Sequence, residues 1–148
     1  MRQLMLAGAL TFFVAAPAGA APDAIRGEQV YTRCVACHAP AYDRVGPHHC
    51  GLFGRRAGSV ADFDYSPAMK KSRIVWNEKT LDRFLAKPLK MVPGSKMTYD
   101  GVADRKDRAD LIAYLKHLDE TPECGQLGPQ KRRPGVTQRS VTPLGRPQ

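Results

Sequence analysis

Two cysteines and a histidine stand within five residues of each other, in the segment CVACH at 34–38. Thiolate sulfur and imidazole nitrogen are common zinc ligands, so a zinc site is one interpretation. A C-x-x-C pair can also form a redox-active dithiol of the thioredoxin type, and C-x-x-C-H is the attachment motif of a c-type haem. Each interpretation requires different additional residues or structural elements elsewhere in the chain.

The zinc interpretation would add His48, His49 and Cys50 to Cys34 and Cys37, which are suitable ligand types for a four-coordinate site. No second C-x-x-C and no H-x3-H accompanies them. The dithiol interpretation needs a βαβ unit nearby, and the sequence shows no alternating strand pattern. A haem is therefore the favoured interpretation, and zinc is kept as the alternative.

A covalently bound haem explains the spacing of CVACH. On one helical turn Cys34 and Cys37 can both reach the vinyl groups at the porphyrin edge, and His38 can direct its imidazole at the iron. Met97 is the favoured sixth ligand because it closes VPGSKM, where a Pro-Gly turn can present a single side chain. A thioether in this position raises the reduction potential. The other candidates for the sixth ligand are Met69, Met91, His48, His49 and His117.

Helices are predicted to begin after Asp23, Asn77 and Asp104, each of which can cap a helix N-terminus, and a short helix can follow Pro67. The first is expected to run into CVACH. Apolar residues recur at three- and four-residue spacing. These residues are Ala24, Val30, Tyr31 and Val35 in the first helix, Leu81, Phe84 and Leu85 in the second, and Leu111, Ile112, Leu115 and Leu118 in the last.

Irregular segments at 39–67 and 89–102 separate these helices. Such long loops are unusual inside a compact domain unless they pack on something other than protein. A large buried cofactor would supply the missing core. The prediction is an all-α domain of short helices and long loops wrapped around one covalently bound haem.

The two ends of the chain differ from this domain. Residues 1–20 place Arg2 before an apolar run and end in Ala-Gly-Ala, which is the layout of a cleavable secretory signal peptide. The folded domain is then expected over residues 21–124. Residues 125–148 are basic and rich in Pro, Gly and Gln, so a disordered tail is expected. A solvated tail of an exported protein is the better interpretation, so no nucleic-acid partner and at most peripheral membrane contact are expected.

The order of the motifs resembles class I cytochrome c, in its mitochondrial and proteobacterial soluble subgroup. The resemblance spans roughly residues 25–119 and implies the cytochrome c fold. It also implies one haem c joined to Cys34 and Cys37, with His38 and Met97 as axial ligands. The segments that carry it are CVACH, VGP, GLFGRRAG, FDYSPAMKKSRIVW, VPGSKM and DRADLIAYLK.

The same resemblance assigns further roles by position. Pro47 is implied to accept the N–H of the proximal imidazole, and Arg55, Tyr65, Trp76 and Ser95 to hold the haem propionates. Gly27 and Tyr31 match the face of the first helix that crosses the last helix at Leu111 and Tyr114. Phe84 and Met69 depart from the family, which more often has tyrosine and asparagine there. Cys50 and Cys124 also depart from it, and we expect them to form a disulfide.

By resemblance, the chain is expected to be a monomeric periplasmic carrier of single electrons and not an enzyme. Its donor would be a quinol–cytochrome c oxidoreductase, and its acceptor a terminal oxidase or a periplasmic reductase. A ring of positive charge would steer acidic partners to the haem edge. The residues of this ring are Arg33, Arg44, Lys90 and Lys96. The alternative function is a haem enzyme or gas-binding protein, which requires an open sixth position.

Overall fold

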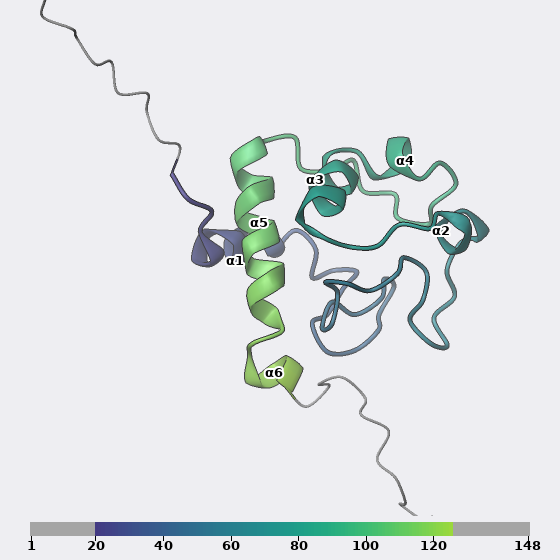
Figure 1. Cartoon of the computed structure of the whole chain (residues 1–148), viewed down its shortest axis with the longest axis horizontal. Helices are drawn as coiled ribbons and strands as arrows, with labels where there is room; N and C mark the ends of the chain where they lie inside the picture. Colours follow the sequence, from purple (N-terminus) through teal and green to yellow (C-terminus); the bar gives the residue numbers. More distant parts are fainter. Residues whose placement is uncertain (1–19, 126–148) are drawn as a thin grey trace, which may run out of the picture.

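The structure is a computed structural model that describes residues 20–125 (Figure 1). The signal peptide and the basic tail predicted from the sequence lie outside these residues, apart from their innermost positions. Within the described part, no helix is long and apolar enough to cross a membrane. The helices are α1 (Ala24–Tyr31), α2 (Pro67–Lys71), α3 (Glu78–Ala86), α4 (Pro88–Met91), α5 (Arg105–Leu118) and α6 (Pro122–Gly125).

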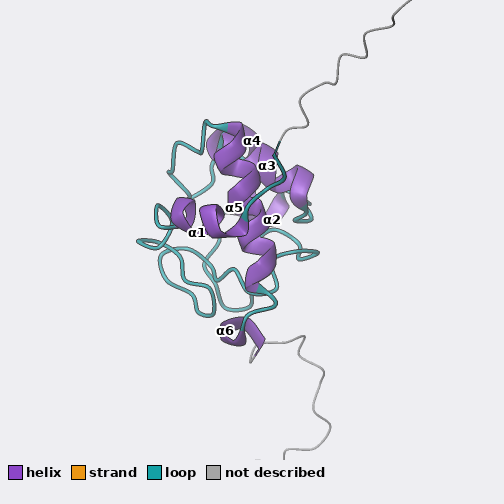
Figure 2. Cartoon of the chain, turned by 90° about the vertical axis from the view of Figure 1, so that its left-hand side faces the viewer, coloured by secondary structure: helices purple, strands orange, loops and turns teal. Residues whose placement is uncertain are grey.

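The frame of the domain is a pair of helices, α1 and α5, that cross and pack against each other (Figures 1 and 2). Their predicted caps are confirmed. The Asp23 carboxylate accepts hydrogen bonds from the N–H groups at the start of α1, and the Asp104 carboxylate accepts one from Asp107 at 2.7 Å. These bonds satisfy backbone donors that have no partner inside the helix.

Helix α3 covers a second side of α5. Asn77 and Thr80 form a reciprocal capping box, which sets the start of α3 where the sequence predicted it. The predicted apolar face of Leu81, Phe84 and Leu85 is buried. Because this face looks toward the interior, α3 forms one wall of the space that the loops enclose.

Two predicted features of the helices were wrong. Helix α1 ends at Tyr31, and CVACH forms hydrogen-bonded turns in which Cys34 O accepts the N–H of Cys37 at 3.0 Å and of His38 at 2.9 Å. Val35 is 44% exposed and is not part of the apolar face. The turns direct Cys34, Cys37 and His38 toward the space that the loops enclose, and they leave Val35 facing outward.

Helices α4 and α6 were not predicted, since both are single turns with no periodic apolar pattern. Each begins with proline, at Pro88 and at Pro122. Proline suits the first position of a helix, because its fixed φ is helical and its missing N–H would have no partner there. Pro88 therefore begins a new turn directly after it ends α3.

The long loops, drawn in teal in Figure 2, also contribute residues to the core. Cys50, Leu52 and Ala57 from the segment between CVACH and α2 are buried, and they belong to the same apolar cluster as α3 and α5. An isolated antiparallel bridge joins Arg56 of this segment to Val75, which lies between α2 and α3. The loops thus wrap around an internal space, as a loop that packs on a cofactor is expected to do.

Candidate functional site

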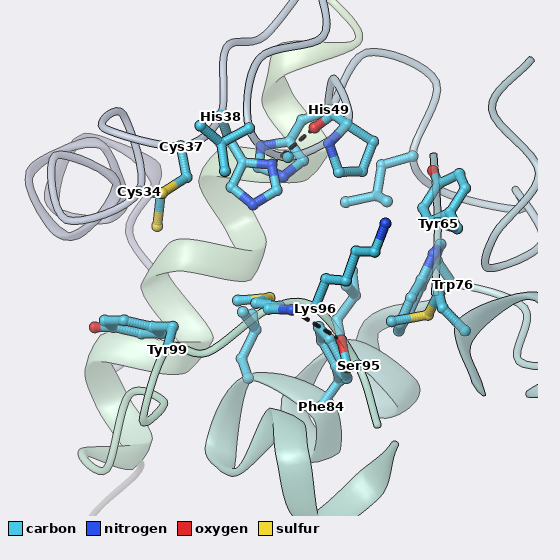
Figure 3. Close-up of a pocket in the computed structure, with 18 of the residues that line it drawn as sticks. Cys34, Cys37, His38, His49, Tyr65, Trp76, Phe84, Ser95, Lys96 and Tyr99 are labelled. Atoms are coloured by element: carbon cyan, nitrogen blue, oxygen red, sulfur yellow. Dashed lines mark hydrogen bonds between the residues drawn. The ribbon is translucent and has the colours of Figure 1, made fainter. Parts of the chain in front are cut away.

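A cavity of about 450 Å³ lies between the loops, α3 and α5. Its size is within the range of about 300–1,000 Å³ that is usual for small-molecule and cofactor sites. Its walls are mostly apolar, and a few polar side chains converge on it (Figure 3). The lining includes every residue that the sequence assigned to haem binding or iron ligation: Cys34, Cys37, His38, Pro47, Arg55, Tyr65, Trp76, Ser95 and Met97.

Cys34 and Cys37 both line the cavity and neither is part of a disulfide; Cys34 is half-buried and Cys37 is exposed. Burial raises the pKa of the Cys34 thiol to about 11, although nearby Arg33 partly opposes this. A redox dithiol depends on a thiolate of low pKa, so this environment does not suit the thioredoxin type of chemistry.

His38 is fixed in one tautomer. Its Nδ1 lies 2.7 Å from the carbonyl oxygen of Pro47, which can only accept, so Nδ1–H is the donor and Nε2 carries a lone pair. Burial lowers the pKa of His38, and the hydrogen bond to Pro47 opposes this in part. The ring points into the cavity (Figure 3). A neutral imidazole with its other nitrogen bonded to a carbonyl is the usual form of a histidine metal ligand.

Glycine at position 46 is a further requirement of this arrangement that the sequence reasoning missed. A Cβ at Gly46 would lie 2.2 Å from Cε1 of His38, so no side chain fits there. The dipeptide Gly46-Pro47 therefore makes room for the imidazole and also supplies its hydrogen-bond acceptor. The signal in the sequence was the glycine of VGP, directly before the residue that was singled out.

Met97 lines the same cavity and is half-buried. Its backbone N–H donates to the Ser95 hydroxyl at 3.1 Å, which ties down the turn that carries it. Figure 3 shows Ser95 and Phe84 across the cavity from His38. The structure thus brings the thioether and the imidazole to one space from segments far apart in the sequence.

The other candidates for a sixth ligand are less well placed. His48 is bonded to Asp43 at 2.7 Å, and His117 lies 3.1 Å from Glu120 on the surface. Neither side chain lines the cavity, and neither does Met91. Met69 and His49 do line it, but Met69 is packed in the apolar core, and His49 stacks directly on His38. Because His49 stacks on His38, it lies on the same side of the cavity as that ring and not opposite it.

The end of the cavity near Arg55 is suited to an anion. The Arg55 guanidinium donates to the carbonyl oxygens of Cys50 at 3.0 Å and His48 at 2.7 Å, and it has no carboxylate partner among residues 20–125. Burial lowers its pKa, and arginine nevertheless stays charged at neutral pH. A buried cation of this kind is stabilised by a nearby anion, such as a carboxylate of a bound group.

Tyr65 and Trp76 complete that end of the cavity. Burial raises the pKa of Tyr65, which keeps its hydroxyl protonated and able to donate. Trp76 is 7% exposed, and its ring lies 5.0 Å from that of Phe84. The polar groups at this end therefore act as donors, which is what propionates require.

The zinc alternative finds no support in the described residues. Nowhere in 20–125 do three or more His, Cys, Asp or Glu side chains come together as metal ligands. Cys50 is joined to Cys124 by a disulfide, with the two Cα atoms 5.3 Å apart. A disulfide sulfur is not a thiolate, so Cys50 is not available as the ligand that this alternative requires.

The four basic residues assigned to partner docking differ in what their side chains contact. Arg33 forms an ion pair with Asp107 at 3.2 Å, and Lys96 pairs with Asp64. Arg44 donates to the carbonyl of Val35 within CVACH, and Lys90 is exposed on α4. Arg33 and Lys96 also line the cavity, so these two lie at its rim.

Comparison with known proteins identifies the class. The family described as Cytochrome c matches residues 24–119, and the chain therefore belongs to the cytochrome c family. Cytochrome c2 of Rhodomicrobium vannielii is 46% identical over 103 residues, which cover 68% of this chain and 82% of that protein. Cytochrome c2 of Blastochloris viridis is 41% identical over 122 residues, which cover 80% of this chain and 95% of that protein.

Among solved structures, cytochrome cH from Methylobacterium extorquens is similar, with a TM-score of 0.62 and 44% identity. The match covers 64% of this chain and 97% of that structure. The all-α cytochrome c fold predicted from the sequence is confirmed. The chain is accordingly an electron carrier with one covalently attached haem c, and not an enzyme.

Proposed function

We propose that this chain is a periplasmic carrier of single electrons whose haem is attached through Cys34 and Cys37. In this proposal His38 and Met97 ligate the iron. The observation that carries it is the His38 imidazole, which is held by Pro47 in the tautomer that leaves Nε2 toward the cavity. Cys34 and Cys37, which line that cavity and take no part in a disulfide, and the Met97 thioether support the same assignment.

The haem supplies an iron that takes up and releases one electron. Around that iron, Pro47 would hold the His38 imidazole, Ser95 would hold the turn of Met97, and the apolar walls would exclude water. A thioether ligand and an apolar site both favour the state of lower charge and raise the reduction potential. Arg55, Tyr65 and Trp76 would offset the charge of the propionates.

Electron transfer to a partner requires an accessible edge. Cys37 is exposed, so a group bonded to it reaches the surface, and Arg33 and Lys96 lie at the rim of the same cavity. Family membership implies redox proteins as partners. The proposed donor is a quinol–cytochrome c oxidoreductase, and the proposed acceptor is a terminal oxidase or a periplasmic reductase. Arg44 and Lys90 would add to the charge that steers an acidic partner to a monomeric carrier.

The proposed location rests on the sequence. Residues 1–20 have the layout of a signal peptide, which would leave residues 21–124 as the domain and 125–148 as a basic tail. The disulfide between Cys50 and Cys124 supports an oxidising compartment, because structural disulfides persist outside the cytoplasm.

Cell fractionation and intact mass spectrometry test this function. The proposal expects periplasmic protein that lacks residues 1–20 and carries the mass of one haem, which acidified organic solvent does not extract. In the double variant Cys34→Ser/Cys37→Ser the covalent haem is lost, whereas it is retained in the matched control Cys50→Ala/Cys124→Ala. Extractable haem in the wild type would contradict the attachment, and cytoplasmic full-length chain would contradict the location.

A further inference from the structure

Three aromatic side chains, Tyr31, His38 and His49, form a cluster in one wall of the cavity. The ring of His49 stacks on the ring of His38, with centroids 4.4 Å apart and an angle of 21° between the planes. The Tyr31 hydroxyl lies 3.0 Å from Nδ1 of His49. Tyr31, His38 and His49 come from the end of α1, from the turns of CVACH and from the following loop, so only the fold brings them together.

Tyr31 is itself held firmly. It is 3% exposed, and its ring lies 5.0 Å from that of Tyr114 on α5. Its contact with His49 holds in either tautomer of a neutral imidazole, because a phenol can both donate and accept a hydrogen bond. The helix crossing of α1 and α5 is thereby connected, through Tyr31, to the orientation of the His49 ring.

The hydrogen bond to Pro47 does not by itself fix the plane of the His38 ring. A single N–H···O contact sets the direction of Nδ1 but leaves the ring free to turn about that direction. The backbone at Gly46 approaches the ring so closely that a Cβ would lie 2.2 Å from it, and the His49 ring packs against it in a nearly parallel arrangement. These two contacts restrict the turning that the hydrogen bond leaves open.

We propose that His49, held by Tyr31, is a positioning residue that sets the plane of the His38 imidazole relative to the haem. This inference rests on the proposed ligation of the iron by His38. The orientation of an axial imidazole plane determines how the unpaired electron of ferric low-spin haem is distributed over the porphyrin. Hyperfine-shifted haem-methyl resonances in the proton NMR spectrum report that distribution directly.

The test uses the ferric holoprotein. In His49→Leu, which still fills the space but removes the flat ring and its hydrogen bond, the haem-methyl resonances are expected to shift and change their spread. Tyr31→Phe keeps the ring packed on Tyr114 and removes only the hydroxyl, so a smaller shift in the same direction is expected. His49→Phe retains a flat ring for stacking and is expected to restore part of the wild-type pattern.

His48→Leu is the matched control, because this neighbouring histidine is bonded to Asp43 and does not line the cavity. Its haem-methyl pattern is expected to equal that of the wild type. Unchanged resonances in His49→Leu would overturn the inference, and so would an equal shift in His48→Leu. If His49→Leu does not fold, Tyr31→Phe decides between these outcomes in the same way.

A wrong assignment of the iron ligands would give a different result from a wrong role for His49. If the wild type itself lacks the visible spectrum of a histidine–methionine haem, the assigned ligation is wrong. If the wild type and His49→Leu both have that spectrum and share one haem-methyl pattern, the ligation stands and only the role of His49 is refuted.

Discussion

Gly27 of α1 lies directly on the backbone of Asp110 in α5: a Cβ at position 27 would be 2.0 Å from the Asp110 carbonyl oxygen. The Asp110 side chain also holds the start of α1, since its Oδ1 accepts the N–H of Asp23 at 2.8 Å. These two contacts with Asp110 hold α1 in place where it crosses α5. They therefore also fix Tyr31 and the turns of CVACH, which follow α1 in the chain.

Replacing Gly27 by alanine is expected to destabilise the protein. The added methyl group meets backbone atoms, which cannot move aside as a flexible side chain can. The free energy of unfolding is therefore expected to fall by about 1–3 kcal/mol. Equilibrium denaturation by urea, followed by tryptophan fluorescence, measures this loss. Gln29→Ala on the exposed face of α1 is the control, with a change within about 0.5 kcal/mol. Equal stability of the two variants would refute the close crossing.

Asp110 gives the domain a pH-dependent contribution to stability. Its side chain is fully buried; burial by itself raises the pKa, but hydrogen bonds from Asp23 N–H and Lys106, together with Arg26, bring the pKa below its ordinary value. Because the folded-state pKa is depressed, the contribution is complete above the unfolded-state value of about 3.9 and is lost as the pH falls through the folded-state pKa.

Thermal unfolding as a function of pH checks this sign. Asp110→Asn is expected to lower the Tm at pH 7, and the difference from the wild type is expected to shrink in acid, below the ordinary pKa of aspartate. The control Asp100→Asn, at an exposed loop position, should leave the Tm unchanged throughout. A difference for Asp110→Asn that grew in acid would contradict the assignment.

The disulfide between Cys50 and Cys124 is expected to stabilise the fold without taking part in electron transfer. It links residues 74 apart, for which the chain-entropy account gives about 4 kcal/mol. The double variant Cys50→Ala/Cys124→Ala should lose stability of this order in chemical denaturation and keep its visible spectrum. Alkylation of the unfolded, non-reduced wild type should label neither cysteine. Two labelled cysteines would show that the bond does not form in the cell.

The ion pair between Lys96 and Asp64 is expected to weaken the positive charge at the rim of the cavity. Asp64→Ala removes the partner, so reduction of the ferric protein by hexacyanoferrate(II), an anion, should become faster. Lys96→Ala should make it slower. Both effects should fade as salt shortens the screening length from about 10 Å at 0.1 M. An equal slowing in the control Lys116→Ala, which does not line the cavity, would show that only net charge matters.

The parts of the fold that could be predicted are those set by local chemistry. Asp23, Asn77 and Asp104 can each satisfy free backbone N–H groups from their own side chain, so the starts of α1, α3 and α5 follow from short segments. The single-turn helices α4 and α6 have no such periodic signal. The prediction that Val35 lies on the apolar face of the first helix was wrong, because α1 ends at Tyr31 and Val35 lies in the turns that follow.

The site was predictable where one motif carries the chemistry, and less so where partners come from distant segments. CVACH and VPGSKM contain the residues assigned to attachment and ligation. Nothing in the sequence indicates that His49 stacks on His38 or that Arg55 bonds to the carbonyls of Cys50 and His48. Those contacts depend on how the loops pack around the cavity. Irregular loops have no periodic residue pattern from which such contacts could be predicted.

The most direct test of the account is the visible spectrum of the holoprotein, oxidised, then reduced, then exposed to carbon monoxide. Ligation by His38 and Met97 predicts sharp low-spin bands, a thioether-to-ferric-iron charge-transfer band that Met97→Ala abolishes, and no response of the wild type to carbon monoxide. Met69→Leu, at the other methionine of the cavity, should keep all three features. A high-spin wild-type spectrum that shifts with carbon monoxide would contradict the account and indicate a ligand-binding or catalytic haem.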